Sequence, residues 1–113
     1  MTPIERLAQQ QLDAYNQADL NAFVACYHPE VRILNGNEES LSGIDDFRTR
    51  YRTLFKEWEF GASVPQRMSL NTHCIDYEQW WRIDPSTGKR SEGHTLVRYE
   101  ERDGLIGTVQ FFR

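Results

Sequence analysis

The chain has 113 residues, with 13 lysines and arginines against 17 aspartates and glutamates, and a formal net charge of −4. This length suits one domain with its own core, so we expect residues 1–113 to form a single domain. An acidic chain without a basic cluster argues against nucleic-acid binding, which needs positive charge gathered on one face. No apolar run reaches membrane-spanning length, the N-terminus MTPIERLAQQ lacks the apolar segment of a secretory signal, and two cysteines imply no disulfide framework. We therefore expect a cytoplasmic protein with no membrane partner.

The N-terminal segment predicts an amphipathic helix that ends near Asn16. Thr2, Pro3 and Glu5 form a helix start, because threonine caps, proline suits the first helical position and glutamate closes a capping box. Apolar residues then recur on one face: Ile4, Leu7, Ala8, Leu12 and Tyr15. Gln11 interrupts that face, either as a boundary residue or as a polar group that points into a cavity.

A second, short helix is predicted after Asp19, which can cap it. Pro29 should end this helix, because a residue before proline avoids the α conformation. Residues 31–34 then predict a strand, and residues 35–37 a turn.

A third helix is predicted to start at Ser42, with Asp45 three residues later, and its apolar residues keep helical spacing as far as Trp58. Three arginines lie on other sides of this helix, and we interpret them as a solvated face in preference to an anion site: Arg48, Arg50 and Arg52.

From about residue 59 the apolar period changes to that of strands. Residues 60–70 contain Gly61 and Pro65 and so predict an irregular or edge strand. Residues 73–84 predict a long strand whose alternate residues face opposite sides. One face carries Ile75, Tyr77, Gln79, Trp81 and Ile83, and the other carries Cys74, Asp76, Glu78, Trp80 and Arg82.

Two further strands, residues 91–101 and 105–112, follow turns at residues 85–88 and 102–104. The long strands carry apolar residues on both faces, which predicts a sheet that is covered on both sides. We expect helices on one face and a second copy of the chain on the other, in a homodimer. Three helices followed by antiparallel strands define an α+β layout.

The order of these elements resembles the NTF2-like superfamily, which includes ketosteroid isomerases and SnoaL-type polyketide cyclases. The segments that carry the resemblance are residues 16–20 (NQADL), 26–30 (CYHPE), 41–43 (LSG) and 99–112. The resemblance covers nearly the whole chain and implies a cystatin-like cone, with three N-terminal helices packed on a curved, mainly antiparallel sheet. Within the superfamily, the chain is similar to short bacterial proteins called SnoaL-like or ketosteroid isomerase-like, of unassigned substrate.

Ketosteroid isomerases move a proton next to a carbonyl with a carboxylate base, and a tyrosine and a protonated aspartate hold the oxyanion. The resemblance puts the base position at Asn35, which does not accept a proton usefully. It puts the oxyanion tyrosine at Gln11 and the oxyanion aspartate near Thr95, while supporting tyrosines fall at Tyr27 and Tyr51. It therefore implies that the pocket is kept and the catalytic acid–base set is replaced, which argues against steroid isomerisation by that mechanism.

Asp76 and Glu78 are the candidates for a replacement base, since they share a predicted strand face with Trp80 and Arg82. The alternative is that these carboxylates are exposed or paired. We expect the cavity to be lined by Gln11, Tyr15, Tyr27, Asn35, Tyr51, Trp80, Thr95 and Gln110.

No metal site and no cofactor are expected, because the histidines are scattered and no C-x-x-C or H-E-x-x-H motif occurs. His94 is interpreted as a surface or boundary residue in preference to a residue of the cavity mouth. Three hypotheses stay open. The chain is an isomerase, cyclase or lyase acting on a small apolar molecule, a non-catalytic ligand-binding module, or a dimerisation domain.

Overall fold

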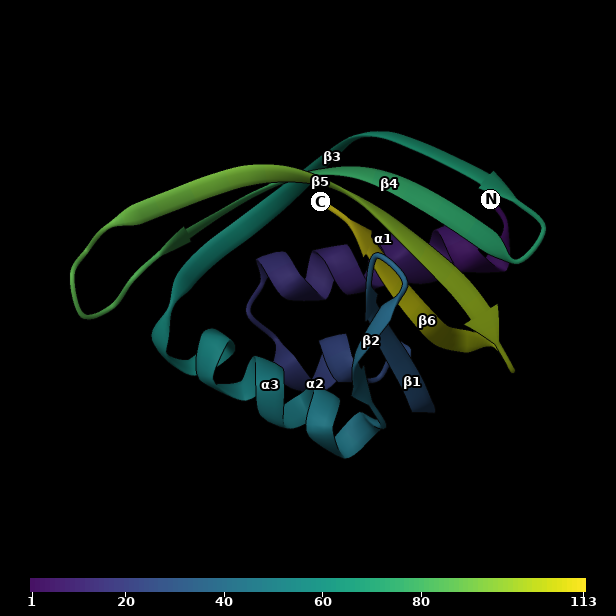
Figure 1. Ribbon diagram of the computed structural model, residues 1–113, viewed down its shortest axis with the longest axis horizontal. Coiled ribbons are helices and arrows are strands. Elements are labelled where there is room, and N and C mark those ends of the chain that lie inside the picture. The colour runs from purple at the N-terminus through teal and green to yellow at the C-terminus, as the bar shows by residue number, and fades with distance from the viewer.

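The computed structural model describes residues 1–113 and contains three helices and one six-stranded sheet (Figure 1). The helices are α1 (Pro3–Asn16), α2 (Leu20–Val24) and α3 (Ile44–Glu57). The strands are β1 (Tyr27–Asn35), β2 (Glu38–Ser42), β3 (Glu59–Leu70), β4 (His73–Ile83), β5 (Arg90–Arg102) and β6 (Leu105–Phe112). Their order is β2-β1-β6-β5-β4-β3, and every neighbouring pair is antiparallel except β1 with β6.

The sheet bends over the helices, so that its concave face looks toward α1, α2 and α3 while its convex face carries no layer of protein (Figure 1). This arrangement confirms the α+β cone with a curved, mainly antiparallel sheet. No helix is long and apolar enough to cross a membrane. The cytoplasmic location stays a prediction.

Helix α1 begins as the sequence predicts. The Thr2 hydroxyl accepts a hydrogen bond from the Glu5 backbone amide at 3.3 Å, and the Glu5 carboxylate accepts one from the Thr2 amide at 3.3 Å. This capping box satisfies two backbone donors that the first turn would otherwise leave unpaired. The buried face includes Gln11, which is 6% exposed.

The short helix α2 ends earlier than expected, at Val24, and β1 begins at Tyr27, so that Pro29 lies within a strand. A strand accepts proline where its ladder is interrupted, because proline has no N–H to donate. The pairing of β1 with β6 is interrupted between Tyr27 and Arg32, and Pro29 lies within this interruption.

The expected start of the third helix is also wrong. Ser42 is the last residue of β2, a short strand that pairs with β1, and the helix begins after Gly43, which has a φ of 94° and provides no side-chain cap. Glycine adopts this left-handed conformation without strain. The chain therefore leaves β2 and enters α3 through a backbone turn in place of a serine cap.

Strand β3 is the edge strand that Pro65 predicts, and its register against β4 shifts between Ser63 and Gln66. The convex face of the sheet exposes five apolar side chains, which we name the outer-face patch: Met68 (73% exposed), Leu70 (73%), Ile75 (36%), Leu96 (47%) and Phe112 (42%). Helices thus cover one face of the sheet as expected, while a second subunit on the other face stays a prediction.

Candidate functional site

A cavity of about 600 Å³ lies between the concave face of the sheet and the helices. Its wall is formed by 21 residues, of which 12 are hydrophobic, from all three helices and every strand except β3. This volume and mixed lining are typical of small-molecule sites. Part of the wall is an aromatic cluster from α2, α3 and β1, in which the ring centres of Tyr27 and Phe47 are 4.3 Å apart.

Most of the residues expected around the cavity lie on its wall: Gln11, Tyr15, Tyr27, Asn35, Tyr51, Trp80 and Thr95. Gln110 does not, because β6 turns Val109 and Phe111 inward and the residue between them outward. On the convex side, the Gln110 amide oxygen accepts a hydrogen bond from Arg98 Nε at 2.9 Å. Its amide nitrogen donates to the Gly36 carbonyl at 2.8 Å.

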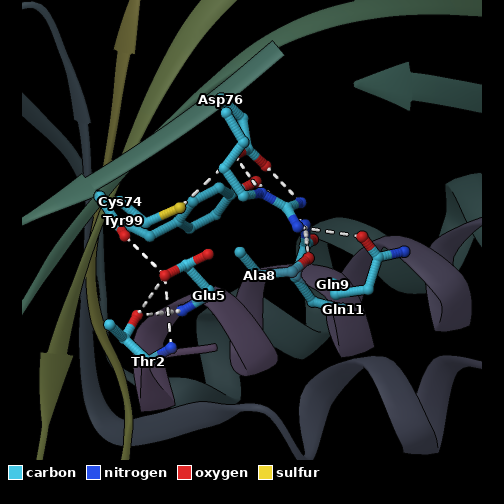
Figure 2. A network of polar contacts seen from close by, with 10 residues as sticks. Thr2, Glu5, Ala8, Gln9, Gln11, Cys74, Asp76 and Tyr99 are labelled. Atoms are coloured by element: carbon cyan, nitrogen blue, oxygen red, sulfur yellow. Dashed lines mark hydrogen bonds and ion pairs between the residues drawn. The ribbon is translucent and has the colours of Figure 1, made fainter. Parts of the chain in front are cut away.

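Asp76, one of the two candidate bases, lies outside the cavity wall. Arg67 on β3 donates to both of its oxygens, from Nε to Oδ1 at 2.6 Å and from Nη2 to Oδ2 at 3.0 Å. Arg67 Nη1 also donates to Gln9 on α1 at 3.0 Å, and Figure 2 shows this network above the helix. Asp76 is 1% exposed and both of its oxygens accept hydrogen bonds from Arg67. Asp76 and Arg67 therefore form a structural ion pair, which joins the sheet to α1 through Gln9.

Glu78, the other candidate base, lies two residues further along the same strand face and lines the cavity. It takes part in none of the ion pairs of the structure. Burial raises the pKa of Glu78 from 4.5 to about 6, an effect that nearby Asp76 increases and that Arg82 and Arg113 oppose. A carboxyl group with such a pKa exchanges its proton near neutral pH, which suits acid–base work.

Gln11 connects two tyrosines beneath the cavity. The Tyr27 hydroxyl donates to the Gln11 amide oxygen at 2.9 Å, and the Gln11 amide nitrogen donates to the Tyr99 hydroxyl at 3.1 Å and to the Ala8 carbonyl at 3.0 Å. Both amide protons of Gln11 are therefore used within the protein. Gln11 thus faces the cavity, as one of the two readings of the sequence proposed, but it has no proton to offer a ligand.

Tyr99 is a functional candidate that sequence reasoning missed. Its hydroxyl accepts from Gln11, while its own proton has no acceptor within the chain. Burial raises the pKa of Tyr99 well above 10, so the hydroxyl keeps its proton. The signal was present in the sequence, because strand alternation places Tyr99 on the same face as Thr95.

Trp80 and Trp81 lie on opposite faces of β4, as alternation predicts. The Trp80 indole lies on Gly93 of β5, where a Cβ atom would come within 2.7 Å of the ring. The Trp81 indole lies in the same way on Gly61 of β3, where a Cβ atom would come within 2.8 Å of the ring. Glycine at each position therefore makes room for a ring, and the Trp80 ring lines the cavity.

Three arginines reach the cavity wall: Arg50, Arg82 and Arg113. The sequence predicts that Arg50 lies on a solvated side of its helix, but in the structure this residue borders the cavity. Its Nη2 atom donates a hydrogen bond to the Ser40 carbonyl at 2.9 Å. His94 also contributes to the wall, although its ring is hydrogen-bonded to the Tyr77 hydroxyl. No group of three or more histidine, cysteine or carboxylate side chains is arranged to hold a metal ion.

A curved sheet over three helices, with a cavity between them, defines the cystatin-like, NTF2-like class of α+β proteins. The model of the SnoaL-like domain matches residues 8–108, and the chain therefore belongs to the SnoaL-like family. No functionally curated protein has a detectably similar sequence.

Solved structures share the fold at low sequence identity. An uncharacterised cystatin-fold protein from Novosphingobium aromaticivorans has 19% identity and a TM-score of 0.87, over 100% of this chain and 99% of that one. A Δ5-3-ketosteroid isomerase from Mycobacterium sp. has 13% identity and a TM-score of 0.89, over 100% and 94%. An LEH-like epoxide hydrolase from Mycobacterium tuberculosis has 14% identity and a TM-score of 0.86, over 97% and 81%.

Proposed function

We propose that this SnoaL-like domain is an enzyme that moves a proton on a small, mainly apolar molecule, in an isomerisation, cyclisation or elimination. Glu78 is the proton acceptor. The observation that carries the proposal is that Glu78 is the only carboxylate on the cavity wall, has no partner, and has a pKa raised to about 6. Asp76, the other candidate, is excluded from this role by its ion pair with Arg67.

Tyr99 supplies the second part of the mechanism. When Glu78 removes a proton next to a carbonyl, negative charge develops on the carbonyl oxygen, and a preorganised hydrogen-bond donor stabilises it. The Tyr99 hydroxyl is oriented by Gln11 and keeps an uncommitted proton for this purpose. The shared fold of a ketosteroid isomerase and an epoxide hydrolase supports small-molecule chemistry in such a cavity.

Turnover tests this proposal. With a panel of cyclic β,γ-unsaturated ketones, formation of the conjugated product is followed by absorbance between pH 4 and pH 9. Because an ionised Glu78 is needed, kcat/KM should rise as pH increases through about 6. Glu78→Gln should lower kcat by about a hundredfold or more. The matched control is Glu38→Gln, which changes an exposed carboxylate on β2, and full activity in Glu78→Gln would refute the assignment.

A non-catalytic ligand-binding domain is the second candidate function. It is favoured by Gln11 and Asn35, two cavity residues that do not titrate and that the resemblance puts at catalytic positions of the isomerases. In that case flat apolar ligands raise the melting temperature through binding to the folded state, but no member of the substrate panel turns over. Turnover that depends on Glu78 would exclude this alternative.

We also propose that two copies of the chain associate through the outer-face patch. Exposed apolar side chains gathered on one sheet face are typical of association surfaces. Light scattering should give the mass of a dimer for the natural chain and of a monomer for Leu96→Lys, which places a charge within the patch. A natural chain that stays monomeric at high concentration would contradict the proposal.

A further inference from the structure

Arg82 lines the cavity with a guanidinium that no carboxylate of the chain neutralises. Its Nε atom is buried and has no hydrogen-bond partner, and Arg82 takes part in no ion pair. Its guanidinium carbon is 5.7 Å from the centre of the Trp80 ring, and its charge opposes the rise in the pKa of Tyr15 that burial causes. Because the protein itself covers Nε, a partner from outside the chain would bind the terminal nitrogens of this guanidinium.

The charge around the cavity is opposite in sign to that of the chain. The chain as a whole carries −4, but three arginines and a single carboxylate line the cavity. Arg50 is bound to Ser40, and the guanidinium of Arg113 lies 4.7 Å from the Phe111 ring centre. These two cations are on exposed residues, whereas Arg82 is partly buried. A positive cavity in an acidic protein concentrates anions and directs them inward.

We infer that the ligand of this cavity is an aromatic or alicyclic carboxylic acid, whose carboxylate binds Arg82 and whose ring lies against Trp80. The two terminal nitrogens of a guanidinium also present parallel N–H groups, which match the two oxygens of a carboxylate. The apolar remainder of the wall accepts the ring. The inference deepens the proposed function, because it names the substrate class for the cavity in which Glu78 acts.

The strand also places the binding residue and the base on the same side of the sheet. Glu78, Trp80 and Arg82 are alternate residues on one face of β4, so the Cα atoms of Glu78 and Arg82 are at most about 13 Å apart. An acid bound at Arg82 therefore lies in the same cavity as Glu78 and on the same strand face.

Binding of matched probes tests the inference. The probes are 4-phenylbenzoic acid and its carboxamide, together with 2-naphthoic acid and its carboxamide, measured by calorimetric titration on the full chain. Each amide keeps the shape of its acid and removes the charge. The variant is Arg82→Met, which keeps an apolar stem, with Arg82→Lys as a second variant that keeps the charge and loses the paired N–H groups.

Arg90→Met is the matched control. Arg90 lies over Trp81 at 4.8 Å from the ring centre, on the opposite face of the same hairpin, where it is paired with Glu92. We expect the natural chain and Arg90→Met to bind at least one acid roughly ten- to a hundredfold more tightly than its amide. Arg82→Met should bind acid and amide equally, at the affinity of the natural chain for the amide, and Arg82→Lys should keep part of the preference.

The inference is overturned if no acid binds more tightly than its amide, including the case in which neither binds, or if the preference survives in Arg82→Met. Failure of the proposed function gives a different result. A Glu78→Gln variant that keeps full turnover refutes the catalytic assignment but leaves the acid preference intact. Loss of the acid preference with turnover still dependent on Glu78 refutes only the inference about the ligand.

Discussion

Glu78→Gln should make the protein more stable at neutral pH while removing its activity. In the folded chain the pKa of Glu78 is about 6, whereas its ordinary value is 4.5. One pKa unit corresponds to about 1.4 kcal/mol, so ionised Glu78 costs the folded state at most about 2 kcal/mol. For a chain of this size, this amounts to a rise in melting temperature of up to about 8 °C in the variant.

The sign of the effect depends on pH. Below pH 4.5 the carboxyl group is protonated in both the folded and the unfolded chain, and it then resembles the uncharged glutamine. Between pH 4.5 and about 6 the unfolded chain releases its proton first, which favours unfolding of the natural protein. Above about pH 6 the whole cost is present. The advantage of Glu78→Gln should therefore be absent at pH 4 and complete at pH 8.

Urea and thermal unfolding of both proteins from pH 4 to pH 8 measure this difference, with Glu38→Gln as the control for an exposed carboxylate that belongs to no ion pair. A stability difference that is the same at every pH would refute the reasoning, because a packing effect of the amide does not titrate. A variant that is less stable than the natural chain at pH 8 would refute it as well. Increased stability with lost activity is the behaviour expected of a residue kept for function.

Two further changes have defined outcomes. Asp76→Asn leaves the Arg67 guanidinium without its counter-charge and should lower the free energy of unfolding by about 3 kcal/mol, measured in urea. The rise of kcat/KM with pH should remain and move to lower pH, because the charge of Asp76 helps to raise the pKa of Glu78. Gly93→Ala should push the Trp80 indole into the cavity and weaken ligand binding at least tenfold by titration. Gly61→Ala crowds the other tryptophan on the convex face, and an equal loss of affinity in that variant would show that the Gly93 effect is not local.

The helices and long strands could be predicted because their signals are local. The capping box at Thr2 and the edge strand around Pro65 depend on residues close together in sequence, and both are confirmed. The predicted start of β1 is wrong, because the strand includes Pro29. A proline is allowed there only by a gap in the pairing with β6, a strand about 75 residues away in the sequence. The helix start predicted at Ser42 is wrong for a similar reason. Pairing with β1 holds Ser42 in a strand, and the residues next to Ser42 in the sequence do not indicate this pairing.

For the candidate site, strand alternation predicts which residues share a face of the sheet. Alternation placed Glu78 and Trp80 on one face and showed which residues accompany them, but it did not distinguish a free carboxylate from a paired one. That difference depends on register, because the shift of β3 around Pro65 brings Arg67 directly opposite Asp76. A slip of one residue would turn the arginine to the other face of the sheet.

The cavity keeps two opposite charges apart, and this separation is the strongest sign that it serves a ligand. Glu78 and Arg82 share a strand face with Trp80 between them, and neither takes part in an ion pair. Pairing would relieve both, yet the structure forms no ion pair between them. The folded state therefore carries the cost of an unpaired carboxylate and of one unpaired guanidinium nitrogen, Nε of Arg82. The nearby pair of Arg67 and Asp76 shows that the same sheet satisfies such groups elsewhere. Unpaired charges of this kind persist where a bound molecule supplies the missing contacts or where a proton is exchanged, and this cavity has one group suited to each role.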